Sequence, residues 1–74
     1  MILKGHINNI DDIQRINRIV SEQEFEVFIS SGDMMFDARS FVALFNLIGK
    51  DVNIIVEDDV DDKLFSKMVK KMRI

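Results

Sequence analysis

The sequence contains no cysteine, no proline, no tryptophan and no tyrosine, and it has only three glycines and one histidine. Because cysteine is absent, neither a disulfide framework nor a zinc–thiolate site can form. A small chain without disulfides fits a reducing compartment, so we expect a cytoplasmic protein. The first seven residues are too few for a signal-peptide core, and no apolar run approaches a membrane span in length. We therefore expect no membrane partner.

The charge balance and the length also exclude several kinds of protein. The formal net charge is −3, and no basic stripe is present, which argues against a nucleic-acid partner. The chain has 74 residues, which we assign to a single domain over 1–74. A domain of this size buries only about 60% of its unfolded surface, which leaves little room for a deep catalytic cleft. A shallow site or a docking face is the better expectation.

No motif for catalysis or metal binding stands out. The acidic residues at 57–62 lack the spaced aspartates and the glycine of a calcium loop. No Ser-His-Asp set and no phosphate-binding loop is present. We predict a protein that is not an enzyme and that uses no cofactor and no metal.

Hydrophobic periodicity predicts seven elements in the order β-α-β-β-α-β-α. The predicted strands cover 2–7, 24–30, 34–38 and 51–57, and the predicted helices cover 10–20, 40–48 and 58–74. This order is typical of an α+β two-layer open-faced sandwich, with a four-stranded antiparallel sheet and three helices on one face. A ferredoxin-like sheet with an added final helix has the same element order, and periodicity does not separate the two.

The two faces of the predicted sheet differ. Alternation along the strands places one set of apolar residues under the helices, namely Phe25, Val27, Ile29, Val52, Ile54 and Val56. The opposite face carries Phe28, Met35 and Ile55, which are apolar and uncovered in a monomer. These three residues are a candidate dimer face.

The stretch from Ser40 to Gly49 is apolar on more than one side. A helical wheel of the run separates two arcs. One arc contains Phe41, Val42 and Phe45, and the opposite arc contains Ala43, Leu44, Leu47 and Ile48. Only one arc can pack on the sheet, so the other is exposed apolar surface of the kind that often marks a binding site. Ser40 is placed to cap this helix, either as an ordinary N-cap or as a phosphorylation site.

The stretch FDARSFVALFNL (36–47) resembles a segment of HPr, the small phosphocarrier of the bacterial sugar phosphotransferase system. In that family a strand ends in a short Ala/Leu-Lys-Ser stretch and an apolar helix follows. The predicted element order matches the family from end to end, and EDDVDDKLFSKMVKKM (57–72) resembles its acidic-start final helix. The resemblance implies that Ser40 matches the regulatory serine, which a dedicated kinase phosphorylates in Gram-positive bacteria. It also implies that Phe41, Val42 and Phe45 match the docking patch, and that the opposite arc faces the core.

The resemblance fails at the histidine that HPr phosphorylates. The family carries this residue just after strand one, in a Gly-x-His-x-Arg-Pro stretch that caps the first helix. Here the corresponding stretch is NNIDDIQR (8–15), which has neither histidine nor proline, and Asp11 and Asp12 would repel a phosphoryl donor. The only histidine, His6, lies inside the first predicted strand. The pattern is closer to HPr-like relatives that lack the histidine and serve as regulators.

These observations favour a bacterial, HPr-like regulatory or binding protein without catalytic activity. Its docking surface would be Phe41, Val42 and Phe45, and Ser40 would be its regulatory phosphorylation site. The expected partners are proteins, such as a serine kinase or a transcriptional regulator of sugar use. Two alternatives stay open: a true phosphocarrier that uses His6, and a structural paralogue that forms a homodimer through its open sheet face.

Overall fold

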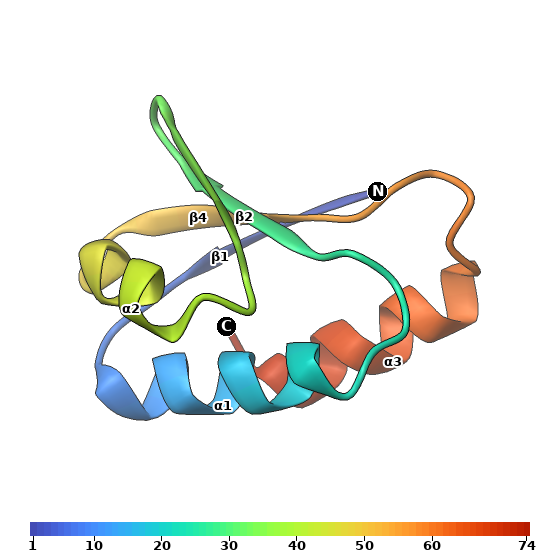
Figure 1. Cartoon of the computed structure of the whole chain (residues 1–74), viewed down its shortest axis with the longest axis horizontal. Helices are drawn as coiled ribbons and strands as arrows, with labels where there is room; N and C mark the ends of the chain where they lie inside the picture. The colour runs from blue at the N-terminus through green and yellow to red at the C-terminus, as the bar shows by residue number, and fades with distance from the viewer.

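Four strands form one antiparallel sheet in the order β1-β4-β2-β3, as the computed structural model of residues 1–74 shows (Figure 1). The strands are β1 (Ile2–His6), β2 (Phe28–Ser31), β3 (Met34–Asp37) and β4 (Asp51–Ile55). The helices are α1 (Ile10–Ser21), α2 (Phe41–Leu44), which continues into a short 3-10 turn (Phe45–Leu47), and α3 (Asp62–Met72). The helices lie on one side of the sheet, α1 and α3 next to each other beneath it and α2 at one end. The predicted α+β open-faced sandwich is confirmed.

The core lies between the sheet and the helices. Alternation along the strands buries one residue in two, so Val27, Ile29, Val52, Ile54 and Val56 are covered, as predicted. Phe25 is half-buried and packs against the same core. The helices complete the core with a larger set of buried apolar side chains: Ile13, Ile16, Ile19, Val20, Leu44, Leu47, Met68 and Met72. No helix of this structure combines the length and the apolar character that a membrane-spanning segment requires.

The hairpin between β2 and β3 has a two-residue turn. Gly32 takes the first position of this turn with φ of 58°. A tight hairpin requires positive φ there, which glycine adopts at no steric cost, so the SSGD stretch forms the turn that its sequence predicts. Gly49, with φ of 82°, ends the segment after α2 in the left-handed conformation expected of a C-terminal cap.

Several element boundaries differ from the predictions. The strand expected over 24–30 is regular only from Phe28 to Ser31. The helix expected over 40–48 is a single α-helical turn followed by a 3-10 turn, and Ile48 is already extended. The helix expected from 58 begins at Asp62, with Asp61 as its N-cap. Asp58 and Asp59 lie in a preceding turn that the bond from Val60 N to the Glu57 carbonyl closes.

Three large apolar residues on or next to the helices are exposed, among them Ile48, which was expected to face the core. Ile10 is 46% exposed in the first turn of α1, Ile48 is 39% exposed, and Leu64 is 51% exposed on α3. Ile48 lies in extended backbone after the 3-10 turn and not on a helical arc. The expectation that Ile48 faces the core was therefore wrong.

Candidate functional site

Ser40 and α2 form the first candidate surface. Ser40 is exposed and is the N-cap of α2, because its Oγ accepts a hydrogen bond of 3.4 Å from the Ala43 N–H. Its own N–H donates to the Asp37 carbonyl at 3.0 Å, which continues the turn out of β3. The hydroxyl is thus accessible, with one long hydrogen bond as its only recorded partner. It could accept a modification without breaking a strong contact.

The short α2 turn has one buried side and one exposed side. Leu44 and Leu47 are fully buried, which confirms their expected position against the core. On the other side Val42 is 76% exposed and Phe45 is 41% exposed. Phe41 differs from expectation because it is half-buried, packs against the core and meets Phe45 edge to face, with ring centroids 5.2 Å apart. Phe41 therefore supports Phe45 more than it offers surface of its own.

Two apolar residues outside the predicted docking patch extend this exposed surface. Ile48 follows the 3-10 turn, and Gly49 donates its N–H to the Ile7 carbonyl at 2.6 Å, which holds this segment against the start of α1. Ile10 then begins α1, and α1 packs against α2. We call Val42, Phe45 and Ile48 the α2 surface. Ile10 is not part of the α2 surface; it is the first residue of the neighbouring helix α1.

Arg39, next to Ser40, is already engaged. Its guanidinium lies 3.5 Å from the Glu26 carboxylate and donates to the carbonyls of Gln23 and Phe25, each at 3.3 Å. The Arg39 carbonyl accepts from the Asn17 side chain at 2.9 Å. These contacts hold the segment before α2 against the residues that precede β2 and against α1. Arg39 thus fixes the position of Ser40 relative to the sheet.

The N-terminus of α1 is the place where the resemblance puts the phosphorylated histidine. Here Asn9 is the N-cap and accepts the Asp12 N–H at 3.0 Å. The Asp12 carboxylate turns back to accept the Asn8 N–H at 2.8 Å and pairs with the Arg15 guanidinium. This reciprocal arrangement is a capping box shifted by one residue. The Asp12 amide of the first helical turn and the Asn8 amide just before the helix are therefore bonded to the chain's own side chains.

The Asp12 carboxylate is buried, with only 7% of the residue exposed. The hydrogen bond from the Asn8 backbone lowers the pKa of Asp12 below its ordinary value, and the ion pair with Arg15 lowers it further, while burial opposes both effects. Asp12 is thus a stable anion at neutral pH. Arg15 in turn donates from Nε to the Met72 carbonyl at 2.7 Å, which joins α1 to the end of α3.

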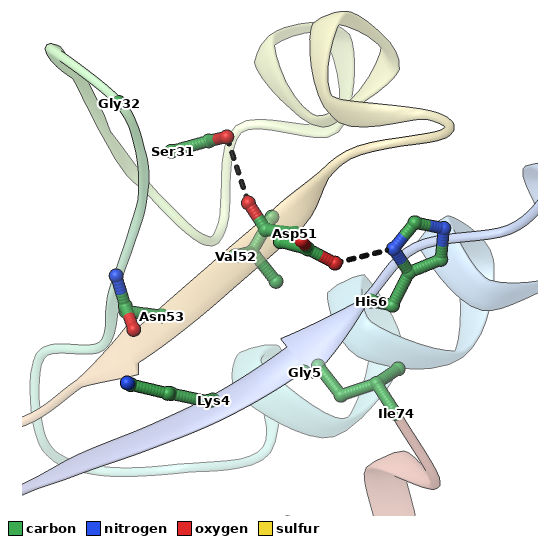
Figure 2. Close-up of a pocket in the computed structure, with 9 residues that line it drawn as sticks. All are labelled: Lys4, Gly5, His6, Ser31, Gly32, Asp51, Val52, Asn53 and Ile74. Atoms are coloured by element: carbon green, nitrogen blue, oxygen red, sulfur yellow. Dashed lines mark hydrogen bonds and ion pairs between the residues drawn. The ribbon is translucent and has the colours of Figure 1, made fainter.

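His6 lies on the open face of the sheet and contacts a residue of the neighbouring strand. His6 and Asp51 are paired in register between β1 and β4, and His6 Nδ1 lies 2.7 Å from Asp51 Oδ1 (Figure 2). The His6 side chain is 45% exposed and that of Asp51 is 94% exposed. When Nδ1 carries the proton it donates to Asp51, and the Nε2 lone pair is then free to act as a base or nucleophile.

The pair borders a shallow, open hollow of about 550 Å³. The hollow is lined by Lys4, Gly5, His6, Ser31, Gly32, Asp51, Val52, Asn53 and Ile74. Ser31 Oγ donates to the Asp51 carbonyl at 2.8 Å, so the Asp51 backbone is fixed from the β2 side as well. Sequence periodicity did not identify this site, because the register that opposes His6 to Asp51 is not encoded in either strand alone. No group of three or more His, Asp or Glu side chains is placed to hold a metal ion.

Comparison with known proteins shows a likeness in fold. No protein-family model matches the chain, and no curated protein sequence matches it. Among solved structures, the chain is similar to HPr-C-His from Thermoanaerobacter tengcongensis, with a TM-score of 0.75 and 14% identity, covering 97% of this chain and 90% of that one. It is also similar to the histidine-containing phosphocarrier protein of a mycoplasma, with a TM-score of 0.74 and 10% identity, covering 97% and 91%. The chain has the HPr-like fold, which settles the choice against a ferredoxin-like sheet.

Proposed function

We propose that this chain is a non-catalytic, HPr-like regulatory protein that binds a protein partner through the α2 surface, with Ser40 as a phosphorylation switch. The observation that carries the proposal is the exposure of Val42 and Phe45 immediately after an accessible Ser40. Exposed, contiguous apolar side chains favour a partner that removes them from water. The HPr-like fold supports a role connected with the bacterial phosphotransferase system. That role would place the protein in the bacterial cytoplasm, as a single domain over 1–74.

The start of α1 supports a regulator rather than a phosphocarrier. A helix N-terminus can bind a phosphoryl group because its amides are unpaired and its dipole is positive. In this chain the Asp12 carboxylate already accepts the Asn8 N–H, and Arg15 pairs with Asp12 instead of with a ligand. An incoming phosphoryl group would meet a buried anion at short range. Phosphoryl chemistry at this position is therefore disfavoured by electrostatics as well as by the missing histidine.

Ser40 phosphorylation would change the α2 surface directly. A phosphoserine carries between about −1.5 and −2 charges at neutral pH. That charge would appear two residues before Val42, at the edge of an apolar contact area. A partner that packs apolar side chains on Val42 and Phe45 would lose affinity, whereas a partner that offers an arginine beside its apolar contact would gain it.

The proposal is tested by binding measurements with two named probes. ¹⁵N-labelled protein is titrated separately with a catalytically inactive phosphotransferase serine kinase and with a transcriptional regulator of sugar use. We expect amide shifts centred on residues 40–48 with at least one probe, and we expect Val42→Asp to abolish them. Leu64→Asp is the matched control, because Leu64 is also exposed but lies on α3. Binding that Val42→Asp leaves intact would contradict the proposed surface.

A second candidate function, phosphoryl transfer through His6, has one specific observation in its favour. Asp51 can hold the proton on Nδ1 and so orient Nε2 as a nucleophile. The Nε2–P bond would form as the bond between phosphorus and the donor breaks, the electron pair of the broken bond would leave with the donor, and the Nδ1 proton would stay in the hydrogen bond to Asp51. The test is labelling by the general phosphotransferase enzyme with phosphoenolpyruvate. This candidate requires labelling that His6→Ala removes and Asp51→Asn weakens.

A further inference from the structure

The open face of the sheet carries an apolar row that no helix covers. In the strand register Ile2 is opposite Ile55, and Ile55 is opposite Phe28, so the three side chains lie side by side across β1, β4 and β2. Ile2 is 65% exposed, and Ile55 and Phe28 are half-buried. Met35, which is 56% exposed, extends the row diagonally on β3. All helices lie on the other side of the sheet (Figure 1).

The rows on either side of this apolar row have complementary character. On one side the register aligns Lys4, Asn53 and Ser30, all of which offer hydrogen-bond donors. On the other side, two residues beyond Ile55 and Phe28 and just outside the strands, lie the exposed carboxylates of Glu57 and Glu26. Neither Lys4 nor Glu57 takes part in any of the ion pairs within the chain. Glu26 is already paired with Arg39, so the two charges beside the apolar row that have no ion pair are Lys4 on one side and Glu57 on the other.

We propose that a second copy of this chain covers the open face, related to the first by a two-fold axis that lies in the interface and crosses the strands at the Ile55 row. With this axis, the apolar row of one copy packs on the apolar row of the other. The row that contains Lys4 and Asn53 then faces the side of the partner that carries Glu57. Asn53 then faces the partner's Glu57, and Lys4 lies one strand spacing, about 4.8 Å, to the side of the same carboxylate. Each contact occurs twice because the interface is isologous. The two sheets keep aligned strand directions, as in face-to-face β-sandwiches.

The charges select this axis over the other two-fold axis that the sheet allows. An axis that runs along the strands, between β4 and β2, would place Lys4 over the partner's Met35, where it meets no carboxylate. The same axis would place Glu57 over the partner's Glu26, which already pairs with Arg39. On β3 the residue opposite Phe28 is Asp37, which would lie in the interface, but its charge does not disfavour the proposed arrangement. Its carboxylate is turned back and accepts the Arg39 N–H at 2.9 Å. The dimer leaves the α2 surface free, so this inference stands independently of the proposed regulatory function.

Charge reversal at Lys4 and Glu57 gives the sharpest test. The mass in solution of the full chain is measured by sedimentation equilibrium from micromolar to millimolar concentration. We expect the mass to rise from 8.6 kDa towards twice that value. Lys4→Glu and Glu57→Lys should each raise the dimer dissociation constant at least about tenfold, and the double variant should restore it to within about threefold. Ile2→Asp, at the exposed start of β1, should abolish dimerisation.

Two controls separate the proposed interface from other outcomes. Lys67→Glu makes the same charge change on the exposed face of α3 and should leave the dissociation constant unchanged. Circular dichroism of each variant shows whether the fold is retained. A mass that stays at 8.6 kDa throughout would overturn the proposal. A dimer whose dissociation constant is unchanged by all the sheet-face substitutions would overturn it as well. So would a double variant whose dissociation constant is as high as that of the single variants.

Discussion

The carboxylate of Asp12 accepts a 2.8 Å hydrogen bond from the backbone N–H of Asn8, so the first turn of α1 is stabilised by an anion of its own chain. The same carboxylate pairs with Arg15, which also donates to the Met72 carbonyl of α3. One buried group thus stabilises both the start of α1 and its contact with α3. In an HPr-like fold this is also the helix end that a phosphoryl-accepting histidine would need.

Replacing Asp12 should destabilise the fold. Asp12→Ala leaves the Asn8 N–H and the Arg15 guanidinium without their partner, so we expect the free energy of unfolding to fall by about 2 kcal/mol. Asp11→Ala, one residue earlier and exposed, should change it by no more than about 0.5 kcal/mol. Urea denaturation followed by circular dichroism measures both. Equal effects of the two substitutions would show that Asp12 has no special structural role.

The contribution of Asp12 should depend on pH in a defined direction. Its pKa in the folded chain lies below the ordinary value of 3.8, chiefly because of the Asn8 hydrogen bond. A lowered pKa contributes stability that is fully present above the ordinary value and is lost as the pH falls through the folded value. The difference in unfolding free energy between the wild type and Asp12→Ala should therefore be constant from about pH 7 to 5 and shrink below about pH 4. A difference that grows on acidification would contradict this sign.

Substitutions in α2 should separate its two sides. Leu44→Ala removes a fully buried side chain, and we expect it to lower the free energy of unfolding by about 2–5 kcal/mol. Val42→Ala, two residues earlier on the exposed side, should cost no more than about 0.5 kcal/mol. Thermal or urea unfolding distinguishes them. A large loss at Val42 would mean that the α2 surface is part of the core and is not free for a partner.

The start of α3 can be located by its N-cap. The Asp61 carboxylate accepts the Lys63 N–H at 2.7 Å, so Asp61→Ala should cost about 1 kcal/mol. Asp59→Ala, in the preceding turn, should be close to neutral. If Asp59→Ala were the costlier substitution, the helix would begin before Asp62. Urea denaturation is again the measurement.

The sequence predicts most of the fold because its periodic patterns are strong. The alternation around Val52 and Ile54 identifies β4, one of the two inner strands, and the stripe that ends in Met68 and Met72 identifies α3. The start of α3 was misplaced because the acids at 58, 59, 61 and 62 are equally good caps in sequence. Only the turn closed by the Val60 N–H distinguishes Asp61 from its neighbours.

The candidate sites were predicted less completely, since they depend on tertiary contacts. Ser40 and the exposed Val42 follow from local pattern, but Ile48 was assigned to the core because the wheel assumed one continuous helix. Ile2 could have been found by strand parity, because it alternates with the covered Leu3 of the same strand. The contact between His6 and Asp51 could not have been found from the sequence, since these residues are 45 positions apart and meet only through the register of β1 on β4.

Mass spectrometry after two parallel reactions tests the central claim most directly. The protein is incubated with the phosphotransferase serine kinase and ATP, and separately with the general phosphotransferase enzyme and phosphoenolpyruvate. A protein that regulates through Ser40 and carries no phosphoryl group on histidine should gain one phosphoryl group in the first reaction, absent in Ser40→Ala, and none in the second. An acid-labile phosphoryl group on His6, lost in His6→Ala, would contradict the account. If neither enzyme modifies the protein, Ser40 is not its phosphorylation switch.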